Sequence, residues 1–233
     1  MRCCIFLLSI SLNAVLTLHY VVPSVKNRLS QIEYYYDTSN DTSNSQTEYH
    51  YDTSNPRYSM RLSMFELFEG DADIVFLGDS LTERANWNEL YPNLTTLNRG
   101  IGGDTTEGIL MRIDEVMTHH PKMIVIMAGL NDLAHGISID SAAENMQSII
   151  ERVHALDENT MIIVESVIWA QDVDQGDINR LNSKYEELCI NTDWAEYIDV
   201  SAPFLDGGYL YGEDGIHLNG EGYKTLVDMQ KIY

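Results

Sequence analysis

The sequence has little cysteine, little proline and few basic residues. Three cysteines and five prolines occur in 233 residues. Cys3 and Cys4 lie in an N-terminal apolar run, which leaves Cys189 alone in the rest of the chain and excludes a disulfide there. No group of His, Cys, Asp and Glu residues has the spacing of a metal site, so we expect neither a metal nor another cofactor.

The shortage of basic residues makes the chain strongly acidic. Fourteen Lys and Arg residues stand against 36 Asp and Glu residues, which gives a net charge of −22. Residues 1–62 carry equal numbers of the two kinds, so the whole excess belongs to the remainder. A domain this acidic repels phosphate backbones and anionic lipid head groups. We therefore expect no nucleic-acid partner and read the charge as a solvated surface.

The N-terminus carries an apolar run that the rest of the chain lacks. It extends from Cys3 to Val22 and has the basic residues Arg2 and Lys26 on its two sides. Its length lies between that of a signal-peptide core and that of a membrane span. We expect residues 1–25 to form a signal or signal-anchor segment, and the protein to be extracytoplasmic, either membrane-anchored or secreted. Basic residues on both sides leave the topology open.

A low-complexity segment follows. The sequence Tyr-Asp-Thr-Ser-Asn occurs at residues 36–40 and again at 51–55, and aliphatic residues are nearly absent around it. Such a segment cannot bury enough apolar area to fold alone. We interpret residues 26–59 as a spacer and residues 60–233 as the folded domain. A tyrosine-rich repeat that binds a surface is the alternative for the spacer.

Short apolar runs alternate with helical patterns through the predicted domain. Five runs indicate strands, at residues 73–78, 96–98, 123–127, 161–164 and 196–200. Helical spacing appears at 109–117, 142–156, about 176–192 and about 220–232, with Ser141 and Glu144 as a capping box. Continuous apolar strands between helices predict a three-layer αβα sandwich, an α/β fold with a flavodoxin-like parallel five-stranded sheet.

Polar residues and glycines follow the predicted strands, where sites form in parallel sheets. Ser80 follows the first strand, and His217 lies three residues after Asp214 near the end of the chain. A serine hydroxyl needs a base within hydrogen-bond reach to act as a nucleophile. His217 is the candidate base, and Asp214 is the candidate acceptor that orients its imidazole.

Acyl transfer to a serine also requires hydrogen-bond donors for the oxyanion that develops. Gly103 lies in a glycine-rich loop whose backbone can approach a substrate closely, and the side chain of Asn131 offers an amide. The backbone N–H of Ser80 is a third donor. Taken singly, Ser80 is better explained as the N-cap of a helix, and the other residues can also be explained as cap or turn residues. Their joint placement after successive strands favours one site.

Four blocks of residues resemble those of the GDSL, or SGNH, hydrolase family. They are Gly-Asp-Ser-Leu at 78–81, Gly-Ile-Gly-Gly-Asp-Thr-Thr at 100–106, Gly-Leu-Asn-Asp at 129–132 and Asp-Gly-Ile-His-Leu-Asn-Gly at 214–220. The motifs are closest to α-subunit-like platelet-activating-factor acetylhydrolases and to bacterial acyl and acetyl esterases. The resemblance implies the SGNH hydrolase fold, a Ser80–His217–Asp214 triad, and Ser80, Gly103 and Asn131 as the oxyanion hole.

The function expected from these residues is hydrolysis of carboxylic esters with short acyl groups, such as the acetyl ester of a carbohydrate or a small lipid, through an acyl-serine intermediate. Two other functions stay open. One is a catalytically silent, tethered domain that binds a glycan or a protein. The other is a flavodoxin-like redox module, which leaves Asn131 and His217 without a role. The sequence does not indicate the oligomeric state.

Overall fold

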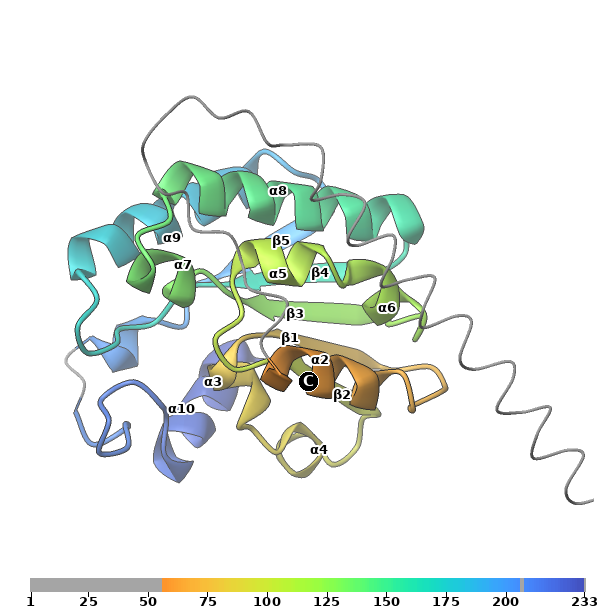
Figure 1. The fold of residues 1–233 in the computed structure, drawn as a ribbon, viewed down its shortest axis with the longest axis horizontal. Helices are drawn as coiled ribbons and strands as arrows, with labels where there is room; N and C mark the ends of the chain where they lie inside the picture. Colours follow the sequence, from red (N-terminus) through yellow and green to blue (C-terminus); the bar gives the residue numbers. More distant parts are fainter. Residues whose placement is uncertain (1–55, 206–207, 233) are drawn as a thin grey trace, which may run out of the picture. The chain divides into compact units, whose positions relative to one another are not determined.

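The computed structural model of the chain describes residues 56–205 and 208–232. Five strands form one parallel sheet in the spatial order β2-β1-β3-β4-β5 (Figure 1). The strands are β1 (Ile74–Gly78), β2 (Thr96–Gly100), β3 (Met123–Met127), β4 (Met161–Glu165) and β5 (Ala195–Ile198). The predicted fold class, a flavodoxin-like parallel five-stranded sheet, is confirmed.

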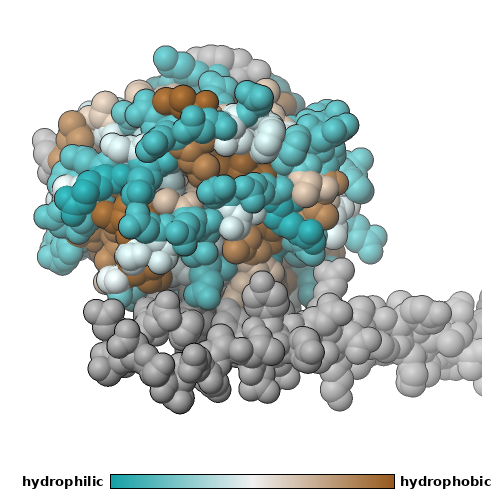
Figure 2. Space-filling model, turned by 90° about the horizontal axis from the view of Figure 1, so that it is seen from above, coloured by the Kyte–Doolittle hydropathy of each residue, from teal (hydrophilic) through white to brown (hydrophobic). Residues whose placement is uncertain are grey.

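Helices cover both faces of this sheet. They are α2 (Pro56–Phe65), α3 (Ser80–Glu83), α4 (Trp87–Leu90), α5 (Thr106–Leu110), α6 (Ile113–Met117), α7 (Leu130–Ala134), α8 (Ile139–Leu156), α9 (Gln175–Ile190) and α10 (Gly220–Gln230), with the 3₁₀ helix η1 (Ala202–Phe204). Helices α8 and α9 lie together on one side in Figure 1, and α3, α4 and α10 lie on the other. Hydrophilic residues surround smaller hydrophobic areas on the face that Figure 2 shows.

The hydrophobic core lies on both faces of the sheet. Every residue of β1 is buried, as the unbroken apolar sequence predicts for a strand covered on both faces. On one face, Phe76 stacks on Trp87 at 3.7 Å between ring centroids and on Tyr91 at 5.4 Å. On the other face, α8 buries a stripe of apolar residues at helical spacing, namely Ala142, Met146, Ile149, Ile150 and Val153.

Two local predictions were wrong. The helix expected over 109–117 is interrupted, because Arg112 leaves the helical conformation and separates α5 from α6. The N-cap of α8 is Ser138, whose side chain accepts a hydrogen bond from the backbone N–H of Ser141 at 3.0 Å. Ser141 therefore lies within the first turn, since the helix begins earlier than its apolar stripe indicates.

Of the predictions for the N-terminal region, only the boundary between spacer and domain falls within the described residues, in α2. This helix begins at Pro56, so the predicted boundary between spacer and domain at residue 60 falls inside it. The predicted signal segment, 1–25, lies outside the described residues. Among the residues that the structure describes, no helix is long and apolar enough to cross a membrane.

Glu165 is a carboxyl group buried at the end of β4. Its side chain is almost fully enclosed, and its Oε1 atom has no hydrogen-bond partner among the described residues. Burial raises the pKa of Glu165 from 4.5 to about 8. The unfolded chain releases this proton near pH 4.5, whereas the folded protein holds it up to about pH 8. The free energy of unfolding therefore falls as the pH rises from about 4.5 to about 8.

Glu165→Gln should remove part of this pH dependence, because the amide has no proton to lose. We expect the variant to be more stable than the wild type at pH 8.5, by at least about 1 kcal/mol, and close to it at pH 5. Urea unfolding of both proteins at the two pH values measures the difference. Parallel stability profiles would show that Glu165 ionises normally in the folded protein.

Candidate active site

Ser80 is the first residue of α3, directly beyond the carboxyl end of β1. Asp79 caps this helix, since its Oδ1 accepts a hydrogen bond from the backbone N–H of Leu81 at 2.9 Å. A side chain at Gly78 would collide with Thr82, so glycine permits the helix to start this close to the strand. The local sequence therefore places the half-buried Ser80 side chain at the edge of the sheet.

His217 and Asp214 reach the same edge from the loop before α10. The Nε2 atom of His217 lies 2.9 Å from the Oγ of Ser80, and its Nδ1 lies 2.7 Å from Oδ2 of Asp214. With the Nδ1 proton donated to Asp214, Nε2 is left as an acceptor for the Ser80 hydroxyl proton. The three residues thus form one hydrogen-bonded chain.

The turn that carries Asp214 also keeps its carboxylate ionised. Oδ1 accepts the backbone N–H groups of His217 at 2.9 Å and Ile216 at 3.0 Å. The backbone and side-chain hydrogen bonds from His217, followed by that from Ile216, hold the pKa of Asp214 well below its usual range. Gly215, with φ of +62°, allows the tight turn that brings these groups together.

Asn131 and Gly103 lie on neighbouring loops of this edge. Asn131 is in α7, which follows β3, and its Nδ2 donates to Asp79 Oδ2 at 3.1 Å and to the carbonyl oxygen of Asp104 at 2.9 Å. Gly103 has φ of +83°, a conformation that favours glycine. The backbone N–H groups of Ser80 and Gly103 donate to no other described residue. Both amide protons of Asn131 are therefore engaged, while the two backbone donors are not.

The position of this edge matches the place where ligands bind in open parallel sheets. Strands β1 and β3 are neighbours at which the strand order reverses, and such a switch point opens a crevice beyond the carboxyl ends of the strands. Ser80 follows β1 and Asn131 follows β3. The sheet topology thus brings together residues that are 51 positions apart in the sequence.

Arg112 is a residue of this region that sequence reasoning missed. Its buried guanidinium bonds Asp104 at 2.9 Å and also donates to the backbone carbonyls of Arg99 at 2.7 Å and Gly78 at 3.1 Å. It therefore joins the ends of β1 and β2 to the loop that carries Gly103. Burial raises the pKa of Asp104 to about 6, although the guanidinium opposes this shift. No local pattern in the sequence indicates these contacts.

Arg112→Met should destabilise the fold by about 3 kcal/mol, because it leaves Asp104 and two carbonyl groups buried without their donor. Guanidinium chloride unfolding measures this loss. Arg152→Met is the matched control, since Arg152 forms an exposed pair with Asp114 at 2.9 Å and should contribute less than about 1 kcal/mol. Equal losses of stability in the two variants would show that Arg112 does not hold the strand ends and the loop that carries Gly103 together.

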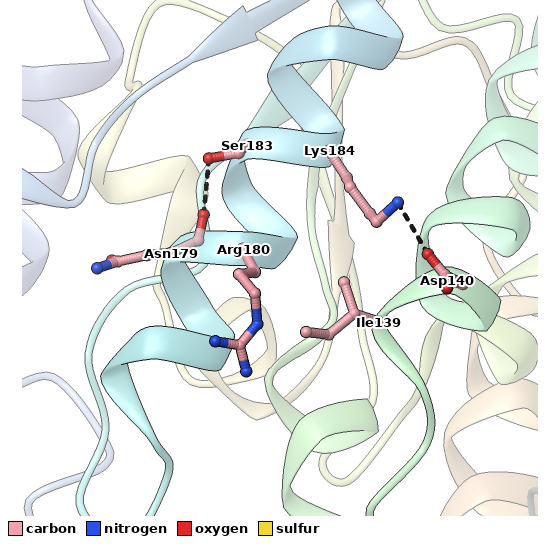
Figure 3. Close-up of a pocket in the computed structure, with 6 residues that line it drawn as sticks. All are labelled: Ile139, Asp140, Asn179, Arg180, Ser183 and Lys184. Atoms are coloured by element: carbon pink, nitrogen blue, oxygen red, sulfur yellow. Dashed lines mark hydrogen bonds and ion pairs between the residues drawn. The ribbon is translucent and has the colours of Figure 1, made fainter.

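A surface hollow lies elsewhere, between α8 and α9 (Figure 3). Lys184 of α9 forms an ion pair with Asp140 of α8 at 2.8 Å across it. The other lining residues are Ile139, Asn179, Arg180 and Ser183. None of the predicted site residues contributes to this hollow. Within 56–205 and 208–232, no group of three or more His, Cys, Asp and Glu side chains is arranged to hold a metal ion.

Comparison with known proteins shows which family this sequence resembles. The model of the GDSL-like Lipase/Acylhydrolase family matches residues 76–225. Platelet-activating factor acetylhydrolase IB subunit alpha2 of Rattus norvegicus is 27% identical over 171 residues, which cover 67% of this chain and 73% of that protein.

Solved structures give the same fold. A GDSL-like lipase of Bacteroides thetaiotaomicron superimposes with a TM-score of 0.64 at 23% identity, covering 75% of this chain and 95% of the other. A family 3 carbohydrate esterase of Clostridium thermocellum does so with a TM-score of 0.59 at 19% identity, covering 69% and 93%.

Proposed function

This chain belongs to the GDSL-like lipase/acylhydrolase family and is a carboxylic ester hydrolase, and on that premise we propose that it removes short acyl groups through an acyl-enzyme intermediate on Ser80. The observation that carries the proposal is the hydrogen-bonded chain from Ser80 through His217 to Asp214 at the switch point of the sheet. This arrangement supplies a nucleophile, a base and an orienting carboxylate.

In the proposed reaction, Ser80 Oγ attacks the ester carbonyl carbon while its proton passes to Nε2 of His217. The imidazolium then gives that proton to the departing alcohol, and the acyl group stays on Ser80. Water attacks the acyl carbon with His217 as the base, which releases the carboxylic acid and restores the serine. Asp214 stabilises the imidazolium in both steps, because its low pKa keeps it ionised.

The developing oxyanion needs donors aimed at it, and we assign this role to the backbone N–H groups of Ser80 and Gly103 and to the Asn131 amide. In the free enzyme, the amide protons of Asn131 are held by Asp79 and Asp104. Use of Asn131 as a donor therefore requires one of these bonds to be exchanged for a bond to the substrate oxygen.

Close packing next to Ser80 supports the proposal of a short acyl group. A crevice lined by Asp79, Leu81, Met127, Ala128, Leu130, Val167 and Ile168 has no room for a water molecule. The names of similar proteins, an acetylhydrolase subunit and a carbohydrate esterase, support an acetyl ester as the substrate class.

The acyl preference is tested with p-nitrophenyl esters of increasing chain length, together with an acetylated sugar and an acetylated ether lipid. We expect kcat/KM to be highest for acetyl and to fall steadily as the acyl chain lengthens. Activity confined to long-chain esters would overturn the short-acyl proposal and leave the esterase assignment intact. A protein that turns over none of these esters and resists a fluorophosphonate would instead be the silent binding domain.

We also propose that the enzyme acts outside the cytoplasm, secreted or held at a membrane by the apolar run that ends at Val22. A spacer of polar residues between this run and the domain would let the site reach esters of surface glycans. Fractionation and protease accessibility of the full-length chain in its native host test the placement. A protease-protected, cytoplasmic pool alone would contradict it.

A further inference from the structure

The carboxylate of Glu83 connects three segments beside the proposed oxyanion hole. Glu83 is the last residue of α3, the helix that Ser80 begins. Its Oε2 accepts the backbone N–H of Gly102 at 2.6 Å, which fixes the peptide just before Gly103. The same carboxylate is only 14% exposed, so water contributes little to its solvation and its protein partners matter more.

Those other partners come from α2. The Nη2 atom of Arg57 lies 2.9 Å from Oε2 of Glu83, and Nε of Arg61 lies 3.4 Å from Oε1. Arg61 also donates to the carbonyl oxygen of Gly100 at 3.0 Å, at the end of β2. Both guanidinium groups thus hold the carboxylate of Glu83, and that of Arg61 also holds the strand end that leads into the Gly102–Gly103 turn.

Apolar packing fixes α2 in this place. Tyr58 and Phe65 of α2 are buried with Ile101, the residue just before the Gly102–Gly103 turn. The hydroxyl group of Tyr58 donates to the carbonyl oxygen of Gly108 at 3.2 Å, in α5 on the far side of that turn. The space is filled so closely that a Cβ atom at Gly102 would lie 2.9 Å from the guanidinium carbon of Arg57. Helix α2 therefore contacts the chain both before and after the Gly102–Gly103 turn.

Helix α2 also lies outside the part of the chain that the family model matches, which begins at residue 76. We infer that α2 is a positioning element for the active site, which holds Glu83 through Arg57 and Arg61 and so orients the Gly102–Gly103 turn toward the substrate oxygen. The inference rests on the proposed role of Gly103. It extends that role to side chains that never touch the substrate.

The test compares three variants of the full-length chain. Glu83→Ala removes the acceptor for Gly102, and we expect kcat to fall about tenfold, less than the ~10²–10³-fold loss of a whole oxyanion donor. The double variant Arg57→Met, Arg61→Met changes only residues of α2, and we expect it to lower kcat in the same way. Glu83→Gln keeps an oxygen for the Gly102 N–H, so it should retain more of kcat than the alanine variant. KM should change less than about twofold throughout, because the ground-state contacts of the substrate remain.

Asp114→Ala is the matched control, since it removes a carboxylate held by two contacts of 2.9 Å to Arg152, between α6 and α8. Its kcat should equal that of the wild type. The inference is overturned if Glu83→Ala and the double arginine variant keep kcat within twofold, or if kcat recovers fully when the assay is cooled well below each unfolding midpoint. A Ser80→Ala variant that still hydrolyses the ester would refute the proposed function instead.

Discussion

Replacing Ser80 with alanine is expected to lower kcat for ester hydrolysis by about 10⁴-fold or more, since the variant has no atom to accept the acyl group. The hydroxyl group contacts His217 and sits at a helix start that Asp79 caps, so its loss should leave the fold intact. Stopped assays with p-nitrophenyl acetate, corrected for spontaneous hydrolysis, measure the residual rate. Thermal unfolding of the same samples checks the fold.

Ser183→Ala is the control for this substitution. Ser183 lies in α9, lines the hollow of Figure 3 and donates to the carbonyl oxygen of Asn179 at 2.9 Å. The variant should keep the wild-type rate. If it loses activity while Ser80→Ala keeps a tenth of it, the reaction takes place at the hollow between α8 and α9 and not at the strand ends.

Asn131→Ala should lower kcat by about 10²–10³-fold with a small change in KM, because the amide stabilises charge that develops only in the transition state. The side chain also ties α7 to Asp79 and Asp104, so part of the effect passes through the position of these groups. Steady-state kinetics with the acetyl ester give kcat and KM separately.

Asn145→Ala isolates the catalytic part of this loss. Asn145 of α8 likewise donates its amide to a buried residue, the hydroxyl group of Thr106 at 3.1 Å, but it does not reach Asp79. We expect it to lower the unfolding temperature without lowering kcat by more than about twofold. A loss of only a fewfold in Asn131→Ala, or an equal loss in both variants, would remove Asn131 from the oxyanion hole.

The sheet, and the positions of Ser80 and Asn131 beyond the ends of its strands, were predictable because their signals are local. Each strand is a short apolar run, and parallel strands expose their carboxyl ends at one edge. A residue that follows such a run is therefore placed without knowledge of any distant contact. Ser80 and Asn131 were assigned to one site on this basis, and the strand order β2-β1-β3 brings them there.

The residues that hold the site in place were not predictable, because their roles depend on contacts between distant segments of the chain. Arg112 reaches the carbonyl oxygen of Gly78, 34 residues away, and its spacing resembles that of any residue on an amphipathic helix. Arg57 falls within the predicted spacer, where nothing in the sequence links it to Glu83. The engagement of Asn131 by Asp79 likewise appears only once α3 and α7 are side by side.

Covalent modification of Ser80 during turnover can be detected by intact-mass and peptide mass spectrometry after treatment with a fluorophosphonate. We expect loss of activity in step with the addition of one phosphonyl group, located on the peptide that contains Ser80. His217→Ala should slow the labelling strongly, because the base that activates the hydroxyl group is gone. Modification of a different residue, or continued ester hydrolysis by fully labelled protein, would show that Ser80 is not the nucleophile.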